Sequence, residues 1–160
     1  MISHKFSIRR ANKGDALKIS LLKKQTFKKI NFKDYPKKNI DFLCSINSVP
    51  KVLEKLRCEE VFLAVNEDDE LLGTISLNHD KIEGLFIRFD LTDHDIGSSL
   101  LFFVEDYAKS RGLKKIHLFS TKRAVPFYEK EGYRLINEFV WKPKKGLLFK
   151  IFKMEKRLWK

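Results

Sequence analysis

The sequence predicts an α/β domain built around a mixed sheet, and three stretches carry this prediction. Residues 82–89 form a short apolar run typical of a buried strand, a polar hinge follows, and the next segment has apolar residues at helical spacing as far as Gly112. Residues 115–120 again have the composition of a strand, so the two strands are expected to be parallel and joined by a right-handed crossover. Upstream, residues 61–65 and 71–77 are expected to pair as a β-hairpin.

Length and composition frame this prediction. The chain has 160 residues, enough for one domain over residues 1–160 with a sizeable core. With 43% hydrophobic residues and 14 Phe, it does not have the composition of a disordered chain. Its apolar runs are too short to span a membrane, and its first residues lack the apolar core of a signal peptide. Cys44 and Cys58 show no metal-ligand spacing, so we expect free thiols in a reducing cytoplasm.

The first part of the chain is expected to form one strand and at least two helices. Residues 6–10 alternate between apolar and polar side chains, as in a strand. Asn12 or Asp15 can cap a helix over residues 15–29, where apolar residues recur at roughly helical spacing. The stretch after this helix is expected to be irregular or to hold a short helix, and Pro50 opens another helix with an apolar face.

The polar hinge between residues 82–89 and the helix that ends at Gly112 is the expected site of chemistry. A helix that starts there presents unpaired backbone N–H groups in its first turn, and these can hold an anion such as a phosphate. The hinge runs Asp90-Leu91-Thr92-Asp93-His94-Asp95 and is followed by Ile96-Gly97-Ser98-Ser99-Leu100-Leu101. An ordinary connection from strand to helix is the alternative interpretation of this segment.

A second patterned segment follows the strand at residues 115–120. It begins at Thr121 and continues Ala124-Val125-Pro126-Phe127-Tyr128-Glu129-Lys130-Glu131-Gly132-Tyr133. A helix over residues 123–131 places Ala124, Phe127 and Tyr128 on one face, and the following glycine ends it. Phe127 is then a core residue, and the hydroxyl of Tyr128 needs a partner wherever it is buried.

Together these two segments resemble the GNAT superfamily of acyl-CoA-dependent N-acetyltransferases. In that family an Arg/Gln-x-x-Gly-x-Gly/Ala turn after a strand holds the pyrophosphate of CoA, and residues 96–98 match the end of that turn. The family's second motif, Asn-x-x-Ala-x-x-Phe-Tyr-x-x-x-Gly-Phe, is matched in spacing from Ala124 to Tyr133, with Thr121 in the Asn position. With the final residues 154–158, the resemblance covers nearly the whole chain.

The resemblance implies a fold and a co-substrate. The fold is α/β and GNAT-like, with a mixed, mostly antiparallel central sheet, a parallel strand pair at its middle and helices on both faces. The co-substrate is acetyl-CoA or a related acyl-CoA, whose pantetheine arm enters where the two parallel strands separate and pairs with backbone groups of the first strand. The residues expected to contact it are Phe86, Ile87, Thr92, Asp93, His94, Asp95, Ile96, Gly97, Ser98, Thr121 and Phe127.

Thr92 and Asp95 depart from the family turn, which has Arg or Gln at the first position and Gly at the second. An Asp at a helix start is a good N-cap, because its carboxylate accepts hydrogen bonds from the same N–H groups that a pyrophosphate needs. If Asp95 caps the helix, it competes with the co-substrate in both occupancy and charge. If Thr92 or Asp93 is the cap instead, Asp95 can turn outward and the site survives.

Transfer of an acyl group to an amine needs a base and an acid. The resemblance implies that Tyr128 is the general acid that returns a proton to the CoA thiolate. Glu83, on the central strand, is the first candidate for the general base, acting directly or through water, and His117 on the neighbouring strand is the second. Each has a structural alternative, namely a half-buried core tyrosine, a solvated glutamate and a satisfied sheet histidine. The other histidines form no metal pattern with the cysteines.

The positive charge lies at the two ends of the sequence. Residues 1–40 carry a net charge of +10 and residues 142–160 a net charge of +7, whereas residues 41–141 carry −5. One interpretation is a lysine-rich solvated surface, and the other is that the two ends meet in space and bind an anionic partner. In the family the acceptor site is built partly by the first helices and the last hairpin. The charge therefore favours an acceptor of acidic character or one associated with nucleic acid.

Two functions are compatible with these patterns. In the first, an active N-acetyltransferase transfers an acetyl group from acetyl-CoA to a primary amine of an unidentified acceptor by direct attack. In the second, a protein of the same fold has lost tight CoA binding and serves as a basic binding module on RNA or a ribosomal surface. The motif matches favour the enzyme, which we prefer, whereas Thr92 and Asp95 favour the binding module. The 14 Phe leave a homodimer open, through an exposed patch.

Overall fold

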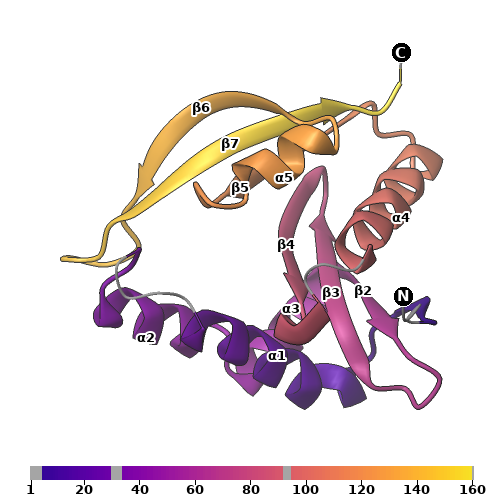
Figure 1. Ribbon diagram of the computed structural model, residues 1–160, viewed down its shortest axis with the longest axis horizontal. Helices are drawn as coiled ribbons and strands as arrows, with labels where there is room; N and C mark the ends of the chain where they lie inside the picture. Colours follow the sequence, from indigo (N-terminus) through magenta and orange to yellow (C-terminus); the bar gives the residue numbers. More distant parts are fainter. Residues whose placement is uncertain (1–4, 30–33, 92–94, 160) are drawn as a thin grey trace.

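A computed structural model describes residues 5–29, 34–91 and 95–159, and over these ranges the chain forms a seven-stranded sheet with helices on both faces (Figure 1). The strands are β1 (Ser7–Arg10), β2 (Glu60–Val65), β3 (Leu71–Asn78), β4 (Lys81–Ile87), β5 (Lys115–Ser120), β6 (Arg134–Trp141) and β7 (Phe149–Arg157). The α-helices are α1 (Ala16–Lys28), α2 (Lys37–Ser45), α3 (Val49–Cys58), α4 (Ile96–Ser110) and α5 (Val125–Lys130). Two short 3-10 helices are η1 (Lys13–Asp15) and η2 (Phe89–Leu91).

The strand order is β1-β2-β3-β4-β5-β7-β6. Neighbouring strands are antiparallel except β4 and β5, which are parallel and are connected through α4. The predicted fold class, a mostly antiparallel sheet with a parallel pair at its middle, is therefore confirmed. The hairpin of β2 and β3 and the crossover from β4 to β5 lie where the sequence predicts them.

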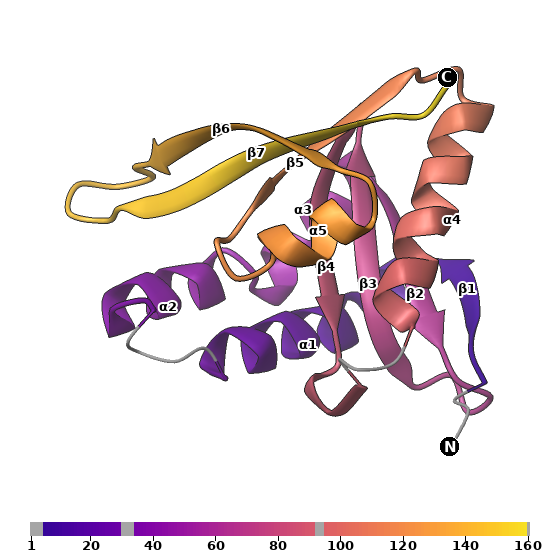
Figure 2. The same cartoon turned by 45° about the horizontal axis from the view of Figure 1, so that its top comes forward.

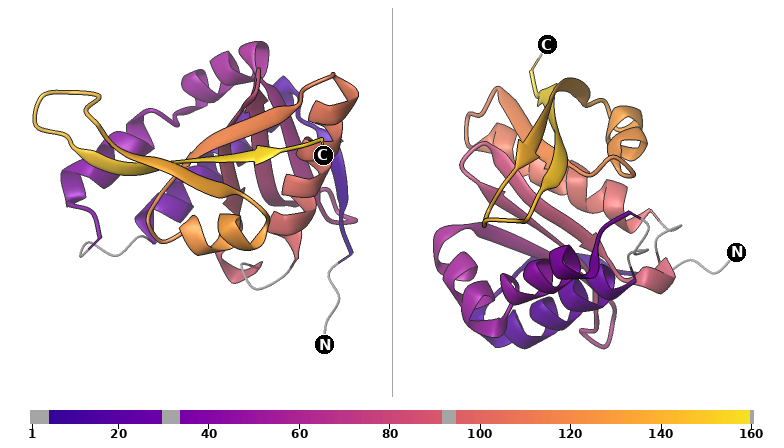
Figure 3. Two further views of the ribbon diagram at one scale, coloured as in Figure 1. Left: turned by 90° about the horizontal axis from the view of Figure 1, so that it is seen from above. Right: turned by 90° about the vertical axis from the view of Figure 1, so that its left-hand side faces the viewer.

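Strand β2 shows how the two faces of the sheet are covered. Val61, Leu63 and Val65 pack against α1 and α3, whereas Phe62 and Ala64 belong to the larger core beneath α4. This alternation follows from the two-residue period of a strand, in which successive side chains point to opposite faces. Figure 3 shows α1, α2 and α3 gathered on one side of the sheet and α4 on the other.

The structure adjusts several predicted boundaries. The stretch before Pro50, expected to be irregular or a short helix, contains α2. The strand predicted over residues 82–89 ends at Ile87, because the chain turns into η2 and leaves the Phe89 side chain 62% exposed. Helix α4 stops before Gly112, whose φ of +83° is the left-handed conformation that favours glycine at a helix end.

Helix α2 and the β6–β7 hairpin bring the two basic ends of the chain together. Phe42 packs against Trp141 and Phe149, with ring centroids 5.9 and 6.1 Å apart. The Nδ2 atom of Asn39 donates a hydrogen bond of 2.9 Å to the carbonyl oxygen of Leu148. Figures 1 and 2 show the hairpin reaching out over α2. The interpretation that the two ends meet in space is confirmed for these segments.

None of the helices in the described ranges combines the length and the apolar character that crossing a bilayer requires. Cys44 and Cys58 are both free, as the sequence predicts.

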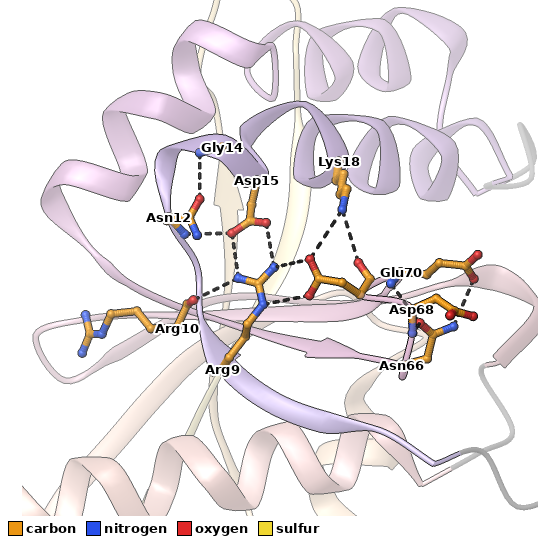
Figure 4. Close-up of polar contacts among 10 residues, drawn as sticks. Arg9, Arg10, Asn12, Gly14, Asp15, Lys18, Asn66, Asp68 and Glu70 are labelled. Atoms are coloured by element: carbon orange, nitrogen blue, oxygen red, sulfur yellow. Dashed lines mark hydrogen bonds and ion pairs between the residues drawn. The ribbon is translucent and has the colours of Figure 1, made fainter.

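An ion-pair network ties β1 to the start of α1 and to the β2–β3 turn (Figure 4). The guanidinium of Arg9 donates two hydrogen bonds, of 2.9 and 2.8 Å, to the carboxylate of Asp15, which is only 4% exposed. Asp15 also accepts from the backbone N–H of Asn12, and the side chain of Asn12 accepts from Gly14. The Arg9 hydrogen bonds lower the pKa of Asp15. On its outer side Arg9 contacts the more exposed Asp69.

Asp15→Asn should therefore destabilise the fold. The exchange removes a charged partner from a nearly buried bidentate pair, and we expect a loss of about 2 kcal/mol in the free energy of unfolding at pH 7. Because the folded-state pKa of Asp15 lies below its unfolded value, the contribution is present above about pH 4 and is lost as the pH falls further. Urea unfolding at pH 7 and pH 3 measures both effects. Asp69→Asn is the matched control and should cost less than about 1 kcal/mol; equal losses for both variants would contradict the assignment.

Candidate active site

The parallel strands β4 and β5 separate soon after they meet. Their paired register contains only Lys81 with His117 and Ile82 with Leu118. Beyond these pairs β4 continues to Ile87 and β5 to Ser120, and Figure 2 shows the two strands diverging. The β4 backbone that follows Ile82 therefore faces β5 without pairing to it. The residues expected to pair with a pantetheine arm, 85–87, lie on this free edge.

A β-bulge lies where this free edge begins. In the pairing of β3 with β4, Leu77 lies opposite Ile82 and Ser76 opposite Gly84, so Glu83 has no counterpart on β3. A bulge of this kind bends a strand and changes the direction of a side chain. A Cβ on Gly84 would lie 2.8 Å from a ring carbon of Phe86, so a side chain there would displace that ring.

The two candidates for the general base lie near the start of the separation. The carboxylate of Glu83 is 3.3 Å from the Nζ atom of Lys81 and accepts a long hydrogen bond of 3.4 Å from Asn78. His117 lies in register with Lys81, and its Nδ1 atom is 3.7 Å from a carboxylate oxygen of Asp80. No hydrogen bond or ion pair joins Glu83 to His117, both of which are among the described residues. Glu83 thus has polar partners in Lys81 and Asn78, and His117 has one in Asp80.

The first turn of α4 meets the end of β4 and helix α5. A Cβ on Gly97 would lie 3.5 Å from the ring of Phe127 and 3.7 Å from Ile87, so these three predicted contact residues are brought together. Asp95 occupies the N-cap position of α4, but its carboxylate makes no capping hydrogen bond to the first-turn N–H groups. Ile96, the first residue of α4, is fully buried. Thr92, Asp93 and His94 lie outside the described residues.

A carboxylate that the sequence analysis missed lies at this helix start. The hydroxyl of Ser98 donates a hydrogen bond of 2.6 Å to the Oε1 atom of Glu131, 33 residues further along the chain. Glu131 precedes the glycine that ends α5, and nothing in its local pattern predicts a contact with α4. The expected anion site at residues 95–98 thus has a negative side chain beside it.

Tyr128 is buried, and its hydroxyl has no hydrogen-bond partner in the described part of the chain. The side chain is 8% exposed and packs edge-on against the rings of Phe127 and Tyr133, with centroids 5.1 and 5.7 Å away. Burial raises the pKa of the Tyr128 phenol to about 12. The hydroxyl therefore keeps its proton at neutral pH. Tyr133 differs, because its hydroxyl donates a hydrogen bond of 2.8 Å to Glu105.

Beyond the end of β5, a cavity of about 550 Å³ separates the β5–α5 connection from α2 and β7. Thr121 lines it, and the Oγ1 atom of Thr121 also accepts a hydrogen bond of 3.3 Å from the backbone N–H of Ala124. Across the cavity, Asp34 forms an ion pair of 3.1 Å with Arg123. Burial raises the pKa of Tyr35, which also lines the cavity. The cavity thus lies between the two segments expected to build the acceptor site.

Two further ionisable side chains, Lys23 and Glu59, were not predicted from the sequence. They lie on the face of the sheet that α1 and α3 cover. Lys23 is 7% exposed, and Glu59 holds a buried carboxylate oxygen. The signal for Lys23 was present: Ile19, Lys23 and Phe27 follow one another at four-residue steps, which puts a lysine on the buried face of α1. The described residues hold no cluster of three or more His, Cys, Asp or Glu side chains suited to a metal ion.

The architecture defines a class of protein. A mixed sheet that opens between two parallel strands, with a helix start and a buried tyrosine at the opening, is the arrangement implied by the acyltransferase resemblance. Residues 33–158 match the family model described as "Acetyltransferase (GNAT) domain". The chain therefore belongs to the GNAT acetyltransferase family.

The chain is also similar to a known protein and to solved structures. The uncharacterized protein YxbD of Bacillus subtilis (strain 168) is 31% identical over 90 residues, which cover 52% of this chain and 57% of that protein, so the match spans little more than half of the relative. A GCN5-related N-acetyltransferase structure from Rhodopseudomonas palustris superimposes with a TM-score of 0.87 over 98% of both chains, at 19% identity. The PaiA N-acetyltransferase of Thermoplasma acidophilum, in complex with coenzyme A, has a TM-score of 0.77 at 20% identity and covers 96% of this chain and 99% of that one. These two structures share the fold.

Proposed function

We propose that this protein transfers an acetyl group from acetyl-CoA to a primary amine by direct attack of the amine on the thioester. The observation that carries the proposal is the free edge of β4 beyond Ile82, which opens next to the start of α4. Backbone groups on such an edge need hydrogen-bond partners, and the amides of a pantetheine arm can supply them. Family membership gives the same class of reaction.

Residues at the opening suit a CoA molecule in most respects. The backbone of Phe86 and Ile87 would pair with the pantetheine arm, and the N–H groups of residues 95–98 would face the pyrophosphate. Thr121 and Phe127 would flank the arm from the other side. Asp95 leaves the first-turn N–H groups free of its carboxylate, which removes the occupancy conflict that its sequence position predicts. Asp95 and Glu131 still place negative charge near the phosphates, so binding weaker than in a site with glycine is expected.

The proposed chemistry needs two proton movements. The acceptor arrives as an ammonium and gives one proton to Glu83, acting directly or through water, so that the free amine can attack the thioester carbonyl. The C–N bond forms, the C–S bond breaks, and Tyr128 protonates the departing thiolate. Tyr128 regains a proton from the nitrogen of the former amine. The raised pKa of Tyr128 fits a group that starts the reaction protonated.

The acceptor is proposed to carry negative charge. Lys142, Lys144 and Lys145 are exposed on the β6–β7 turn, and the Nζ atom of Lys144 lies 5.8 Å from the ring centroid of Phe42 on α2. Lys122 and Lys150 line the cavity beyond β5. These cations surround the region between α2 and the hairpin, where an acidic group on the acceptor would be attracted.

Acetyl-CoA binding is the first test. The wild-type protein should bind acetyl-CoA, and at a hundred times the dissociation constant the fold should be stabilised by about 2.7 kcal/mol in a thermal-shift experiment. Glu131→Gln keeps an acceptor for Ser98 but removes one negative charge, so affinity should rise roughly two- to five-fold, and less at high salt. Asp95→Gly should act in the same direction, whereas Asp106→Asn on the exposed side of α4 is the control and should change nothing. No shift in any variant, together with tight RNA binding, would favour the binding-module hypothesis.

Tyr128→Phe tests the general acid. Removal of the hydroxyl should lower kcat roughly a hundredfold or more while the dissociation constant of acetyl-CoA stays unchanged. CoA release is measured by thiol detection with a panel of amines that includes glutamate, aspartate, lysine amide and spermidine. Because the Tyr128 hydroxyl has no internal partner, the melting temperature should not fall. Tyr133→Phe is the matched variant: it should lose stability through Glu105 but keep kcat. Equal kcat values for the wild-type protein and Tyr128→Phe would reject the role.

Replacement of Lys142, Lys144 and Lys145 together by Ala tests the acceptor hypothesis. We expect KM for glutamate or aspartate to rise roughly tenfold and KM for lysine amide to stay within about twofold, because only the acidic acceptors lose attraction. Lys13, Lys51 and Lys114 replaced by Ala form the charge-matched control, since they are exposed outside the hairpin. Identical acceptor kinetics in the two triple variants would contradict the hypothesis.

A further inference from the structure

Lys23 is a buried cation without a polar partner. Its side chain comes from α1, is 7% exposed, and donates no hydrogen bond to any described residue. Its Nζ atom lies 5.2 Å from the ring centroid of Phe86, on the free part of β4. Burial of a lone ammonium is costly, and its usual outcome is a group that gives up its proton easily.

Glu59, which follows α3, is unpartnered in the same region. Its Oε2 atom is buried and has no hydrogen-bond partner within the described chain. Lys23 and Glu59 line one small cavity, together with Thr74, Ser76 and Gly84. Both residues are described, and neither a hydrogen bond nor an ion pair joins Lys23 to Glu59 across the cavity. The cavity offers about 10 Å³, roughly the space that one water molecule requires.

The charged groups around this cavity come from three elements. Lys55 on α3 and Glu59 after it line the cavity with Lys23. Glu83 at the β4 bulge does not line it but acts on Lys23 electrostatically. Burial, and after it the charge of Lys55, lower the pKa of Lys23 to about 8, although the carboxylates of Glu59 and Glu83 act in the opposite direction. Burial likewise raises the pKa of Glu59, and Glu83 adds to that effect, while Lys55, Lys23 and Lys81 oppose it. Lys23, Glu59 and Glu83 thus influence one another electrostatically.

We propose that Lys23 and Glu59, bridged by one water molecule in this cavity, form a buried pair that takes over from Glu83 the proton removed from the acceptor amine. The inference rests on the proposed acetyl transfer and deepens it, because it identifies where the proton goes. Both side chains are positioning residues, since they act through Glu83 and do not contact the substrate. The one-water size of the cavity and the two unpartnered groups that face it are the observations that carry the proposal.

The proton balance is simple. In the active state Lys23 is neutral and Glu59 is a carboxylate. Glu83 receives a proton from the acceptor ammonium and passes it through water to the Nζ atom of Lys23, which becomes an ammonium held by Glu59. The proton leaves to solvent before the next turnover. No oxidant, metal or further reactant is required, and the activity should rise with pH as Lys23 loses its proton.

The protonation of Lys23 is tested without any substrate. In the full-length protein carrying ¹³C-labelled lysine, the Lys23 Cε signal is identified by its loss in Lys23→Met and followed as a function of pH. We expect its midpoint near pH 8, and a lower midpoint in Glu59→Gln, because that variant loses a carboxylate that favours the ammonium. A midpoint near the ordinary lysine value of about 10.4 would overturn the proposal, whatever the enzyme does.

The coupling to catalysis is tested by the pH dependence of kcat/KM for the best amine of the panel. In Lys23→Met the rate should be roughly tenfold below that of the wild-type protein at pH 9 and similar to it at pH 6.5. Lys23→Arg should match Lys23→Met, since a guanidinium cannot accept a proton. In Glu59→Gln the rising limb should move to lower pH. A merely structural role would lower the rate by the same factor at every pH.

Failure of the proton-transfer pair can be told apart from failure of the proposed acetyl transfer. If the wild-type protein transfers acetyl groups but Lys23→Met keeps its pH profile, the proton-transfer pair is rejected and the proposed function stands. If the wild-type protein binds acetyl-CoA but acetylates no amine in the panel, the proposed function fails and the inference fails with it. Lys23→Met should fold, because removal of a buried unpartnered charge is expected to leave the melting temperature unchanged or higher. A crystal structure with water between Lys23 and Glu59 would support the pair.

Discussion

The structure depends on an interrupted strand pairing. β4 and β5 share only two residue pairs, and the bulge at Glu83 begins where this pairing ends. A sheet that stayed paired would have no opening between these strands, whereas a complete break would split the sheet in two. The two halves are instead held together by the two pairs at one end and, at the other, by the packing of Ile87 and Gly97 against Phe127. The opening is thus a fixed feature of the backbone, whose unpaired groups favour an occupant.

The opening between β4 and β5 carries charges of both signs. The start of α4 offers a positive helix end, but Asp95 and Glu131 lie beside it, and Glu131 already binds Ser98. A carboxylate at a helix start stabilises the helix in the absence of any ligand, for the same reason that a phosphate binds there. The carboxylates therefore favour a stable helix start and would weaken anion binding at the proposed phosphate site. The basic surface between α2 and the hairpin attracts anions in general and so offsets part of this repulsion.

The sequence predicted what depends on local patterns. The β2–β3 hairpin, the β4–α4–β5 unit and the glycines that end α4 and α5 follow from periodicity and turn chemistry, and each lies close to its expected position. The second motif placed Phe127 and Tyr128 on α5 for the same reason. The bulge at Glu83 and the contact of Ser98 with Glu131 were not predictable, because both depend on how distant strands and helices align. Lys23 was visible as a lysine on an apolar helix face, but only its neighbours on α3 and β4 give that position a chemical meaning.

The two faces of the sheet differ in polarity, and the two-residue period of a strand explains how one strand can serve both. On β3, Ile75 and Leu77 belong to the apolar core beneath α4, whereas Thr74 and Ser76 line the cavity of Lys23 and Glu59. Because alternate residues point to opposite faces, one strand can seal the α4 side with hydrocarbon and still supply hydroxyl groups to the α1 side. In the proposed mechanism, the proton taken from the acceptor amine would therefore move on the α1 side, where Lys23 and Glu59 line the cavity. Tyr128, which belongs to the core beneath α4, would protonate the thiolate from the other side.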